Sequence, residues 1–338
     1  MVAIVMAEIR DGKFVRNETN ENSMGGTERM VMSLAERLDP DLLKEFQIIG
    51  SRVRDLQEDK IRILYLHDLP GDPESEFLKD KNKMNQFHKF VFVSNWQMQG
   101  YMQSYGIPWS KCVVLRNAID PIVLPKEPKS NDTIRFIYTS TPHRGLNLLV
   151  PVFEKLAEKY DNIHLDVFSS FEIYGWKQRD EQYQELFDQI QNHDQMTYHG
   201  SQPNDVVRDA LTKSHVFAYP SIWPETSCLS LIEAMSAGLV CVHSNYAALP
   251  ETSANWTQMY QLHEDPTHHA GLFYGMLESV IQNYEKTGVF TNLDAMKTYT
   301  DIYYGWDMRV MEWEGLLTSL QKQVTDRSIP SEEFVYTS

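Results

Sequence analysis

The stretch from Val216 to Glu251 constrains the fold of this chain more than any other part of its sequence. It opens with four apolar residues and a proline, a pattern that predicts a buried strand ending in a loop. A second apolar run, Leu239–Val242, predicts another buried strand. Between them, apolar residues recur at helical spacing until Gly238 ends the pattern: Cys228, Leu231, Ile232 and Met235. Strand, loop, helix and strand in this order form the repeating unit of a parallel α/β sheet.

The loop and the helix of this unit each carry a carboxylate, Glu225 and Glu233. The first turn of such a helix presents unpaired N–H groups to the loop, which favours a phosphate there. The carboxylates would repel that phosphate, but they can accept hydrogen bonds from sugar hydroxyls. The combination points to a nucleotide-sugar pocket. The alternative is that Glu225 is solvated and Glu233 caps backbone groups, because two acids at this spacing also occur by chance.

Strand–helix units recur along the chain, which predicts an α/β protein. A first strand is expected at Val2–Ala7, followed by a polar loop, Arg10–Ser23. A strand at Ile61–Leu66 would deliver His67 and Asp68 at its carboxyl end, where parallel sheets bind ligands. A core histidine and a turn-capping aspartate are the alternative for these two residues.

Composition narrows the class of protein. A chain of 338 residues, 42% of them hydrophobic, suits two globular domains. No apolar run approaches the roughly 18 residues of a membrane span, and the amino-terminal residues resemble a strand more than a signal peptide. The three cysteines have no metal-ligand spacing, so we expect reduced thiols in a cytoplasmic protein. The net charge of −16 disfavours a nucleic-acid partner.

The residues PSIWPETSCLSLIEAMSAGLVCV, followed by LPE, resemble the donor-site signature of retaining family 4 glycosyltransferases, which have the GT-B fold. The resemblance implies that Glu225 contacts hydroxyls of the donor sugar and that Glu233 holds the ribose hydroxyls. It places the donor loop between these two acids. In this chain the loop has a different composition from the usual Gly-Phe-Gly: Thr226, Ser227, Cys228 and then Leu229.

The same resemblance implies further site residues. Arg144, followed by glycine, matches the Lys-Gly that holds the donor pyrophosphate in the family. The family's upstream arginine is absent, and Thr139 and Ser140 stand in its place. A loop at His199 and Gly200 would read the nucleotide base, largely through backbone groups. On the opposite wall the resemblance places a Gly-Gly loop and a cleft-facing strand end: Gly25, Gly26, His67 and Asp68.

These features predict an α/β protein of the GT-B type, with two Rossmann-like domains facing each other across a cleft. An amino-terminal acceptor domain is expected at residues 1–124, and a donor domain at residues 125–305. A carboxyl-terminal helix at about residues 306–322 is expected to pack back on the first domain. We expect four residues to act in catalysis: Glu225, His67, Asp68 and Arg144.

The resemblance implies an enzyme that moves a sugar from a nucleotide-diphosphate sugar to an acceptor hydroxyl, with retention of configuration. No metal and no further cofactor would be required. The acceptor would be a glycan, a lipid-linked sugar or another hydroxyl compound. Two alternatives stay open: a non-catalytic protein of this fold that binds nucleotide sugars or carbohydrates, and an enzyme that transfers sugar to nucleic acid.

Overall fold

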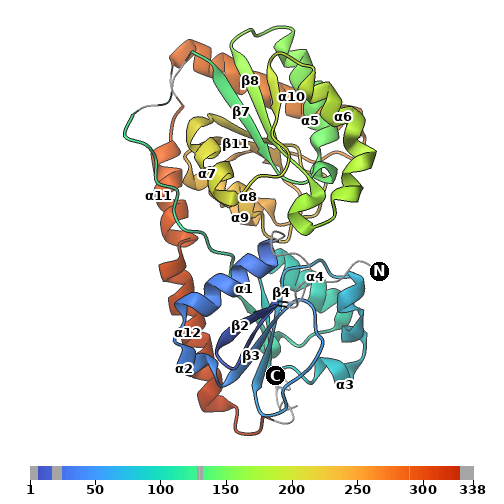
Figure 1. Ribbon diagram of the computed structural model, residues 1–338, viewed down its shortest axis with the longest axis vertical. Coiled ribbons are helices and arrows are strands. Elements are labelled where there is room, and N and C mark those ends of the chain that lie inside the picture. The colour runs from blue at the N-terminus through green and yellow to red at the C-terminus, as the bar shows by residue number, and fades with distance from the viewer. Residues whose placement is uncertain (1–6, 17–24, 128, 130–131, 289, 328–338) are drawn as a thin grey trace. The chain divides into compact units, whose positions relative to one another are not determined.

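A computed structural model describes residues 7–16, 25–127, 129, 132–288 and 290–327. The chain divides into two compact units (Figure 1). Unit 1 contains the residues up to Ala118 and those from Trp306 onward, and unit 2 contains Ile119–Gly305. Within the described ranges, each unit holds one six-stranded sheet. Both units are therefore α/β, as the strand–helix pattern of the sequence predicts.

The sheet of unit 1 combines an antiparallel hairpin with parallel strands. Its spatial order is β2 (Lys13–Arg16), β1 (Ala7–Arg10), β3 (Phe46–Gly50), β4 (Ile61–Leu66), β5 (Lys89–Phe92) and β6 (Cys112–Val114). β1 is antiparallel to both of its neighbours, and the pairs from β3 onward are parallel. The prediction for Ile61–Leu66 is confirmed. The strand predicted at Val2–Ala7 lies outside the described residues apart from Ala7.

The polar loop predicted at Arg10–Ser23 is wrong for Lys13–Arg16, which forms β2. Asp11 and Gly12 make the two-residue turn between β1 and β2, with φ values of 51° and 77°. Two successive left-handed residues are what the tightest hairpin turn requires, and Asp-Gly is one of its preferred sequences. The signal is present in the sequence, but the charged residues at both ends of β2 conceal the short strand.

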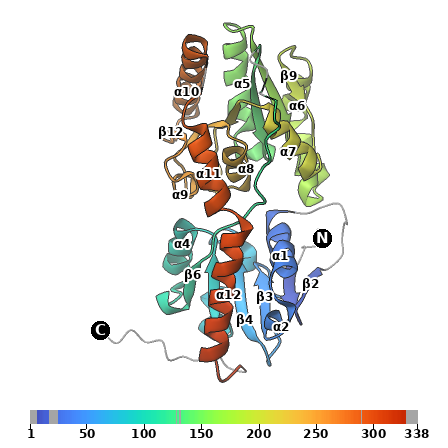
Figure 2. The same cartoon turned by 90° about the vertical axis from the view of Figure 1, so that its left-hand side faces the viewer.

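Helices complete unit 1: α1 (Gly26–Arg37), α2 (Pro40–Leu43), η1 (Pro73–Lys79), α3 (Lys81–Met84), α4 (Asn95–Tyr105), η2 (Trp109–Lys111) and α12 (Trp306–Gln323). The last of these comes from the far end of the chain and runs along the sheet of unit 1 (Figure 2). Its Trp313 is buried, and the centroid of the indole lies 5.1 Å from the ring centroid of Tyr65 in β4. Arg37 of α1 covers the ring of Trp306 at 4.8 Å.

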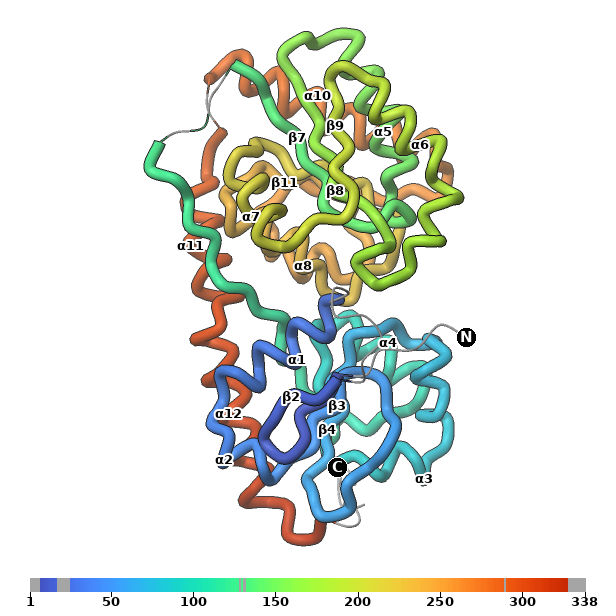
Figure 3. The backbone as a smooth tube through the Cα atoms, viewed as in Figure 1, coloured from blue at the N-terminus to red at the C-terminus, as the bar shows by residue number. Residues whose placement is uncertain are grey.

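The sheet of unit 2 is parallel throughout its described length. Its order is β12 (Gln258–Tyr260), β11 (Val240–Ser244), β10 (Val216–Tyr219), β7 (Ile134–Thr139), β8 (Ile163–Phe168) and β9 (Met196–Tyr198). Strands of such a sheet are covered on both faces, which explains why all four residues of β10 are buried. Figure 3 traces the alternation of these strands with helices in unit 2.

The helical segments of unit 2 are η3 (Pro142–Arg144), α5 (Leu146–Ala157), η4 (Phe171–Tyr174), η5 (Lys177–Tyr183), α6 (Gln184–Gln191), α7 (Asn204–Lys213), α8 (Leu229–Ser236), α9 (Leu249–Ser253), α10 (Pro266–Thr287) and α11 (Leu293–Tyr303). The apolar face predicted for α8 is buried, as expected for Cys228, Leu231, Ile232 and Met235. Among the described residues of the whole chain, no helix combines the length and apolar character that crossing a membrane requires.

One glycine sets the distance between two loops of unit 2. Gly145 lies between η3 and α5 with φ of 117°, a conformation that L side chains rarely adopt. A Cβ atom at this position would overlap the carbonyl oxygen of Pro220, the residue that follows β10. The absence of a side chain therefore allows the loop after β7 to pack directly on the loop after β10.

We expect Gly145→Ala to lower the free energy of unfolding by about 3 kcal/mol or more, because backbone strain and steric overlap both act there. Gly238→Ala is the matched control, since Gly238 also has positive φ (65°) but an added Cβ has nothing within 4 Å. The control should cost only about 1 kcal/mol. Urea denaturation of both variants measures the difference, and equal losses would contradict the role given to Gly145.

Candidate functional site

Arg144 and Glu225 meet at the carboxyl ends of the strands of unit 2. Arg144 ends η3, after β7, and Glu225 lies in the loop after β10. The Nη1 of Arg144 donates a hydrogen bond to Oε1 of Glu225. The hydroxyl of Tyr219, at the end of β10, donates to the same carboxylate oxygen. The structure therefore brings together two of the four predicted catalytic residues, and Tyr219 is a partner that the sequence does not reveal.

The ion pair between Arg144 and Glu225 is largely removed from water, which strengthens the attraction between the two charges. Glu225 is 5% exposed, and Tyr219 is fully buried. Burial opposes the charge on the Arg144 guanidinium, but the attraction of Glu225 outweighs it and raises the pKa of Arg144. Burial, reinforced by the negative charge of Glu225, raises the pKa of Tyr219 well above its ordinary value. The tyrosine therefore stays protonated and remains a hydrogen-bond donor at neutral pH.

The residues between Glu225 and α8 mainly pack inward. The backbone oxygen of Glu225 accepts a hydrogen bond from the N–H of Ala248 at 3.1 Å, which anchors the loop. Cys228 is the N-cap residue of α8 and belongs to the hydrophobic core of unit 2. Leu229 packs against a smaller cluster that includes Tyr304. Thr226 and Ser227 are the polar members of this predicted donor loop, and because they are half-buried, their side chains stay partly accessible.

Glu233, on the second turn of α8, is held by side chains of α7. The carboxylate oxygen Oε1 lies 3.1 Å from Nη1 of Arg208 and 3.3 Å from Nδ2 of Asn204. Arg208 also donates to the backbone oxygens of Asp120 (2.7 Å) and Pro121 (3.2 Å). The sequence predicts Glu233 but not Arg208, because nothing in the pattern of α7 distinguishes this arginine from a solvated one.

The end of β7 and the start of α8 are joined by one hydrogen bond. Ser230 Oγ donates to the backbone oxygen of Thr139 at 2.7 Å. The predicted donor-binding residues Thr139 and Ser140 both lie here, half-buried at the carboxyl end of β7. The structure therefore places them beside the first turn of α8 and four to five residues before Arg144 in the chain.

His199 and Gly200 follow β9, where the sequence predicts the base-reading loop. The imidazole of His199 stacks on Phe168 with ring centroids 4.2 Å apart, and its Nε2 lies 2.9 Å from Oδ1 of Asp166. Arg135 binds the other carboxylate oxygen of Asp166 at 2.8 Å. Burial would raise the pKa of Asp166, but the hydrogen bonds from His199 and Arg135 lower it. Sequence reasoning misses Asp166, although an acid inside a buried strand is a recognisable signal.

The remaining predicted residues belong to unit 1. Gly25 is the N-cap residue of α1, and Gly26 is the first residue of that helix. His67 follows β4, and its backbone N–H donates to Ser51 Oγ at 2.9 Å. The centroid of its imidazole ring lies 4.2 Å from the ring centroid of Tyr65. Burial lowers the pKa of His67 to about 3, so this imidazole is neutral at physiological pH. Asp68 lies 4.0 Å from the guanidinium of Arg52, and burial, opposed by Arg52, raises the pKa of its carboxyl.

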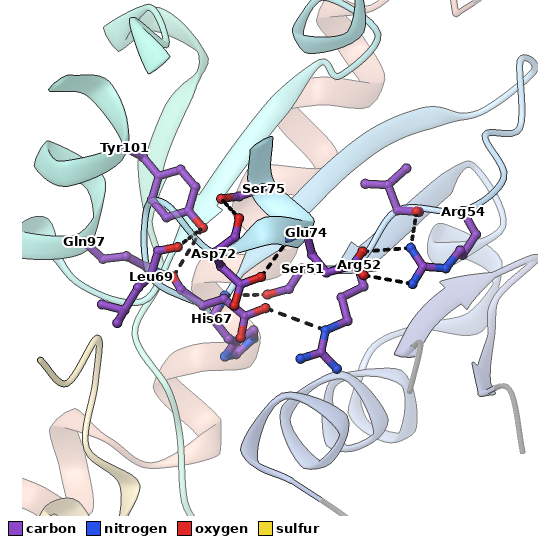
Figure 4. A network of polar contacts seen from close by, with 12 residues as sticks. Ser51, Arg52, Arg54, His67, Leu69, Asp72, Glu74, Ser75, Gln97 and Tyr101 are labelled. Carbon is purple, nitrogen blue, oxygen red and sulfur yellow. Dashed lines mark hydrogen bonds and ion pairs between the residues drawn. The ribbon is translucent and has the colours of Figure 1, made fainter. Parts of the chain in front are cut away.

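A buried amide supports the strand end that carries His67 and Asp68 (Figure 4). Gln97 of α4 is fully buried and donates to the backbone oxygens of Leu66 (3.2 Å) and Asp68 (2.8 Å). Its Oε1 accepts from the N–H of Val93, which follows β5, at 2.9 Å. Gln97 thus connects the carboxyl ends of β4 and β5 by pairing with buried backbone groups of both. The hydroxyl of Tyr101 supports the same strand end, because it donates to the backbone oxygens of Asp68 (3.3 Å) and Leu69 (3.1 Å). No sequence pattern signals this role.

We expect neutral His67 to make stability depend on pH. Its folded pKa lies below the roughly 6.5 of an unfolded histidine, so stability is lost as pH falls from about 6.5 towards about 3. Between about pH 7 and about pH 5, protonation of this histidine in the unfolded state should lower the unfolding free energy of the wild type by about 2 kcal/mol. His67→Gln should lack this part of the decrease. Urea denaturation at the two pH values tests this, with exposed His268→Gln as the control. An unchanged decrease in His67→Gln would contradict the assignment.

The chain is similar to known proteins. Residues 124–289 match the family model described as glycosyl transferases group 1. Two curated relatives are each named as a subunit of phosphatidylinositol N-acetylglucosaminyltransferase. The Homo sapiens protein is 28% identical over 141 residues, or 41% of this chain and 28% of that protein. The Arabidopsis thaliana protein is 25% identical over 179 residues, or 50% of this chain and 38% of that protein. The matches therefore span well under half of either relative.

Solved structures share the arrangement of strands and helices. A glycosyltransferase from Rickettsia africae has a TM-score of 0.62 and 16% identity, covering 79% of this chain and 72% of that one. Anabaena HepE, solved with UDP and glucose, has a TM-score of 0.62 and 17% identity, covering 77% of this chain and 72% of that one. This chain therefore has the GT-B fold, and its residues 124–289 are similar to the glycosyl transferases group 1 family.

Proposed function

We propose that this chain is a glycosyltransferase that moves a sugar from a nucleotide-diphosphate sugar to an acceptor hydroxyl. The contact between Arg144 and Glu225 is the observation that carries the proposal. It places a permanent cation, suited to a diphosphate, beside a buried carboxylate, suited to sugar hydroxyls. Both lie at the carboxyl edge of a parallel sheet, within the segment that matches the glycosyl transferases group 1 family.

We propose UDP-N-acetylglucosamine as the first donor to test. The names of the two curated relatives refer to N-acetylglucosaminyl transfer, and the similar Anabaena structure contains UDP. The same names make phosphatidylinositol one acceptor to test, beside glycans and lipid-linked sugars. His199 and Gly200 would lie at the base, Glu233 at the ribose, and the loop around Thr226 and Ser227 at the diphosphate.

The proposed reaction retains the anomeric configuration and needs no metal ion. The bond between the anomeric carbon and the phosphate oxygen breaks, and the acceptor oxygen bonds to the same face of that carbon. The acceptor proton passes to the departing phosphate oxygen. Arg144 offsets the negative charge that grows on the leaving diphosphate, and Glu225 orients the sugar. Gly25, Gly26, His67 and Asp68 remain proposed contributors to sugar or acceptor binding from unit 1.

Glu225→Gln should lower turnover by about 100-fold, because the neutral amide orients the sugar poorly. The same change should tighten binding of free UDP, since Arg144 loses its buried counter-charge and becomes available to the phosphates. Release of UDP from UDP-N-acetylglucosamine, with and without EDTA, measures turnover, and calorimetry measures UDP affinity. Exposed Glu264→Gln is the control and should change neither.

Two outcomes would contradict this proposal. In the first, wild-type protein binds UDP but releases none from the donor and transfers no sugar to phosphatidylinositol, glycans or lipid-linked sugars. Such a protein would be a binding protein instead of an enzyme. Loss of turnover in EDTA that is restored by magnesium would overturn metal independence alone.

Glu233→Ala should weaken uridine and UDP alike by about 1.5–3 kcal/mol, because both ligands present the ribose to this carboxylate. Arg208→Gln keeps the carboxylate and removes a partner that positions it, so its effect should be smaller. Calorimetry with uridine and UDP distinguishes a role of Glu233 at the ribose from a role at the phosphates or a structural role. A loss confined to UDP would place Glu233 at the phosphates, and unchanged binding of both ligands would leave it a structural residue.

A further inference from the structure

Buried hydrogen-bonding atoms without partners gather around Arg144. In the described part of the chain, Thr141 Oγ1, His143 Nδ1 and Arg144 Nε are buried and have no hydrogen-bond partner. Ser169 Oγ, just after the neighbouring strand β8, is in the same condition. Thr141 is 4% exposed and Ser169 is 2% exposed. Native proteins rarely leave such atoms unpaired, so their concentration beside one loop indicates a ligand that completes the hydrogen bonds.

The chemistry of these atoms specifies the ligand. The hydroxyls of Thr141 and Ser169 can each donate a hydrogen bond, the Nε–H of Arg144 can only donate, and an imidazole nitrogen can donate in one tautomer. The positive end of the twelve-residue helix α5 follows directly after this loop. A set of donors at the positive end of a helix fits the oxygens of an anionic group such as a phosphate.

Aromatic contacts hold His143 in one orientation. Its ring stacks on Phe171, with centroids 5.1 Å apart and an angle of 17°. The ring of Trp223, two residues before Glu225, meets it edge-on at 4.6 Å. Burial, with smaller contributions from Arg144 and Arg179, lowers the pKa of His143 to about 4. His143 is thus a neutral imidazole in a fixed orientation beside Arg144, able to donate from Nδ1 in one tautomer, rather than a second cation.

We infer that Thr141 and His143 bind the diphosphate of the nucleotide sugar together with Arg144. The inference rests on the proposed function and extends it to two residues of this chain. The loop lacks the upstream arginine of the family pattern, and Thr139 and Ser140 stand there. A buried hydroxyl and an oriented imidazole therefore supply by hydrogen bonding what a second guanidinium would supply by charge.

Calorimetry with UDP and uridine tests the inference on the full chain, with GDP and ADP and their nucleosides as further probes of the base. Thr141→Val and His143→Ala should each weaken UDP by about tenfold and leave uridine unchanged, because uridine has no phosphate. Thr141→Ser and His143→Asn keep a donor near the original position and should recover most of the affinity. His268→Ala, at an exposed histidine, should bind like wild type.

Stability supplies a second readout that separates ligand binding from a structural role. The Thr141 hydroxyl has no partner within the described chain, so Thr141→Val should unfold at the same or a higher urea concentration than wild type. Weaker UDP binding without lost stability supports the inference. Equal losses for uridine and UDP, or wild-type UDP affinity in both Thr141→Val and His143→Ala, would overturn it. Wild-type protein that binds no nucleoside diphosphate would overturn the proposed function itself.

Discussion

The parallel pairing of β7 with β10 is the constraint on which the candidate site of unit 2 depends. The strands run side by side, with Val216 opposite Phe136 and Phe217 opposite Ile137, so their carboxyl ends leave the sheet at neighbouring points. The loops that follow carry Arg144 and Glu225, which are far apart in the sequence. Gly145 completes the approach, because only a residue without Cβ fits against the carbonyl of Pro220. An ion pair between distant residues thus follows from strand order and one glycine.

A buried ion pair is costly unless its remaining hydrogen bonds are made, and this pair meets the requirement only in part. Glu225 is well satisfied, since Arg144 and Tyr219 both donate to it. Arg144 is not, because its Nε finds no acceptor among the described residues. The carboxylate therefore occupies part of the hydrogen-bonding capacity of the arginine and leaves part of it unused. The Nε–H of Arg144 can therefore still donate a hydrogen bond to an anionic ligand.

Unit 1 positions its candidate residues by different means. His67 and Asp68 lie at a strand end whose backbone is held by Gln97, a fully buried amide with partners on two strands. Their own side chains are perturbed mainly by burial, which keeps His67 neutral and raises the pKa of Asp68. Arg52, whose guanidinium lies 4.0 Å from the carboxylate of Asp68, opposes the effect of burial on that pKa.

Local sequence patterns determined much of this protein. Apolar runs located β4 and β10, and helical spacing identified the buried face of α8. The motif from Pro220 to Val242, followed by Leu249–Glu251, lies within the segment that matches the glycosyl transferases group 1 model. Short antiparallel strands are harder to predict, and β2 is easily mistaken for a loop because charged residues stand at both of its ends. Three partners of the predicted residues were also beyond the reach of sequence patterns: Tyr219, Arg208 and Gln97. Asp166 differs from them, because an acid inside a buried strand is a recognisable signal. Hydrogen bonds between distant segments leave no periodic signal in a single sequence, so only the tertiary structure decides which side chains meet. The sequence determined which charged and polar groups the candidate site contains. The fold decided which of them, such as Arg144 and Glu225, are paired with each other and which, such as Thr141 Oγ1, lack a hydrogen-bond partner among the described residues.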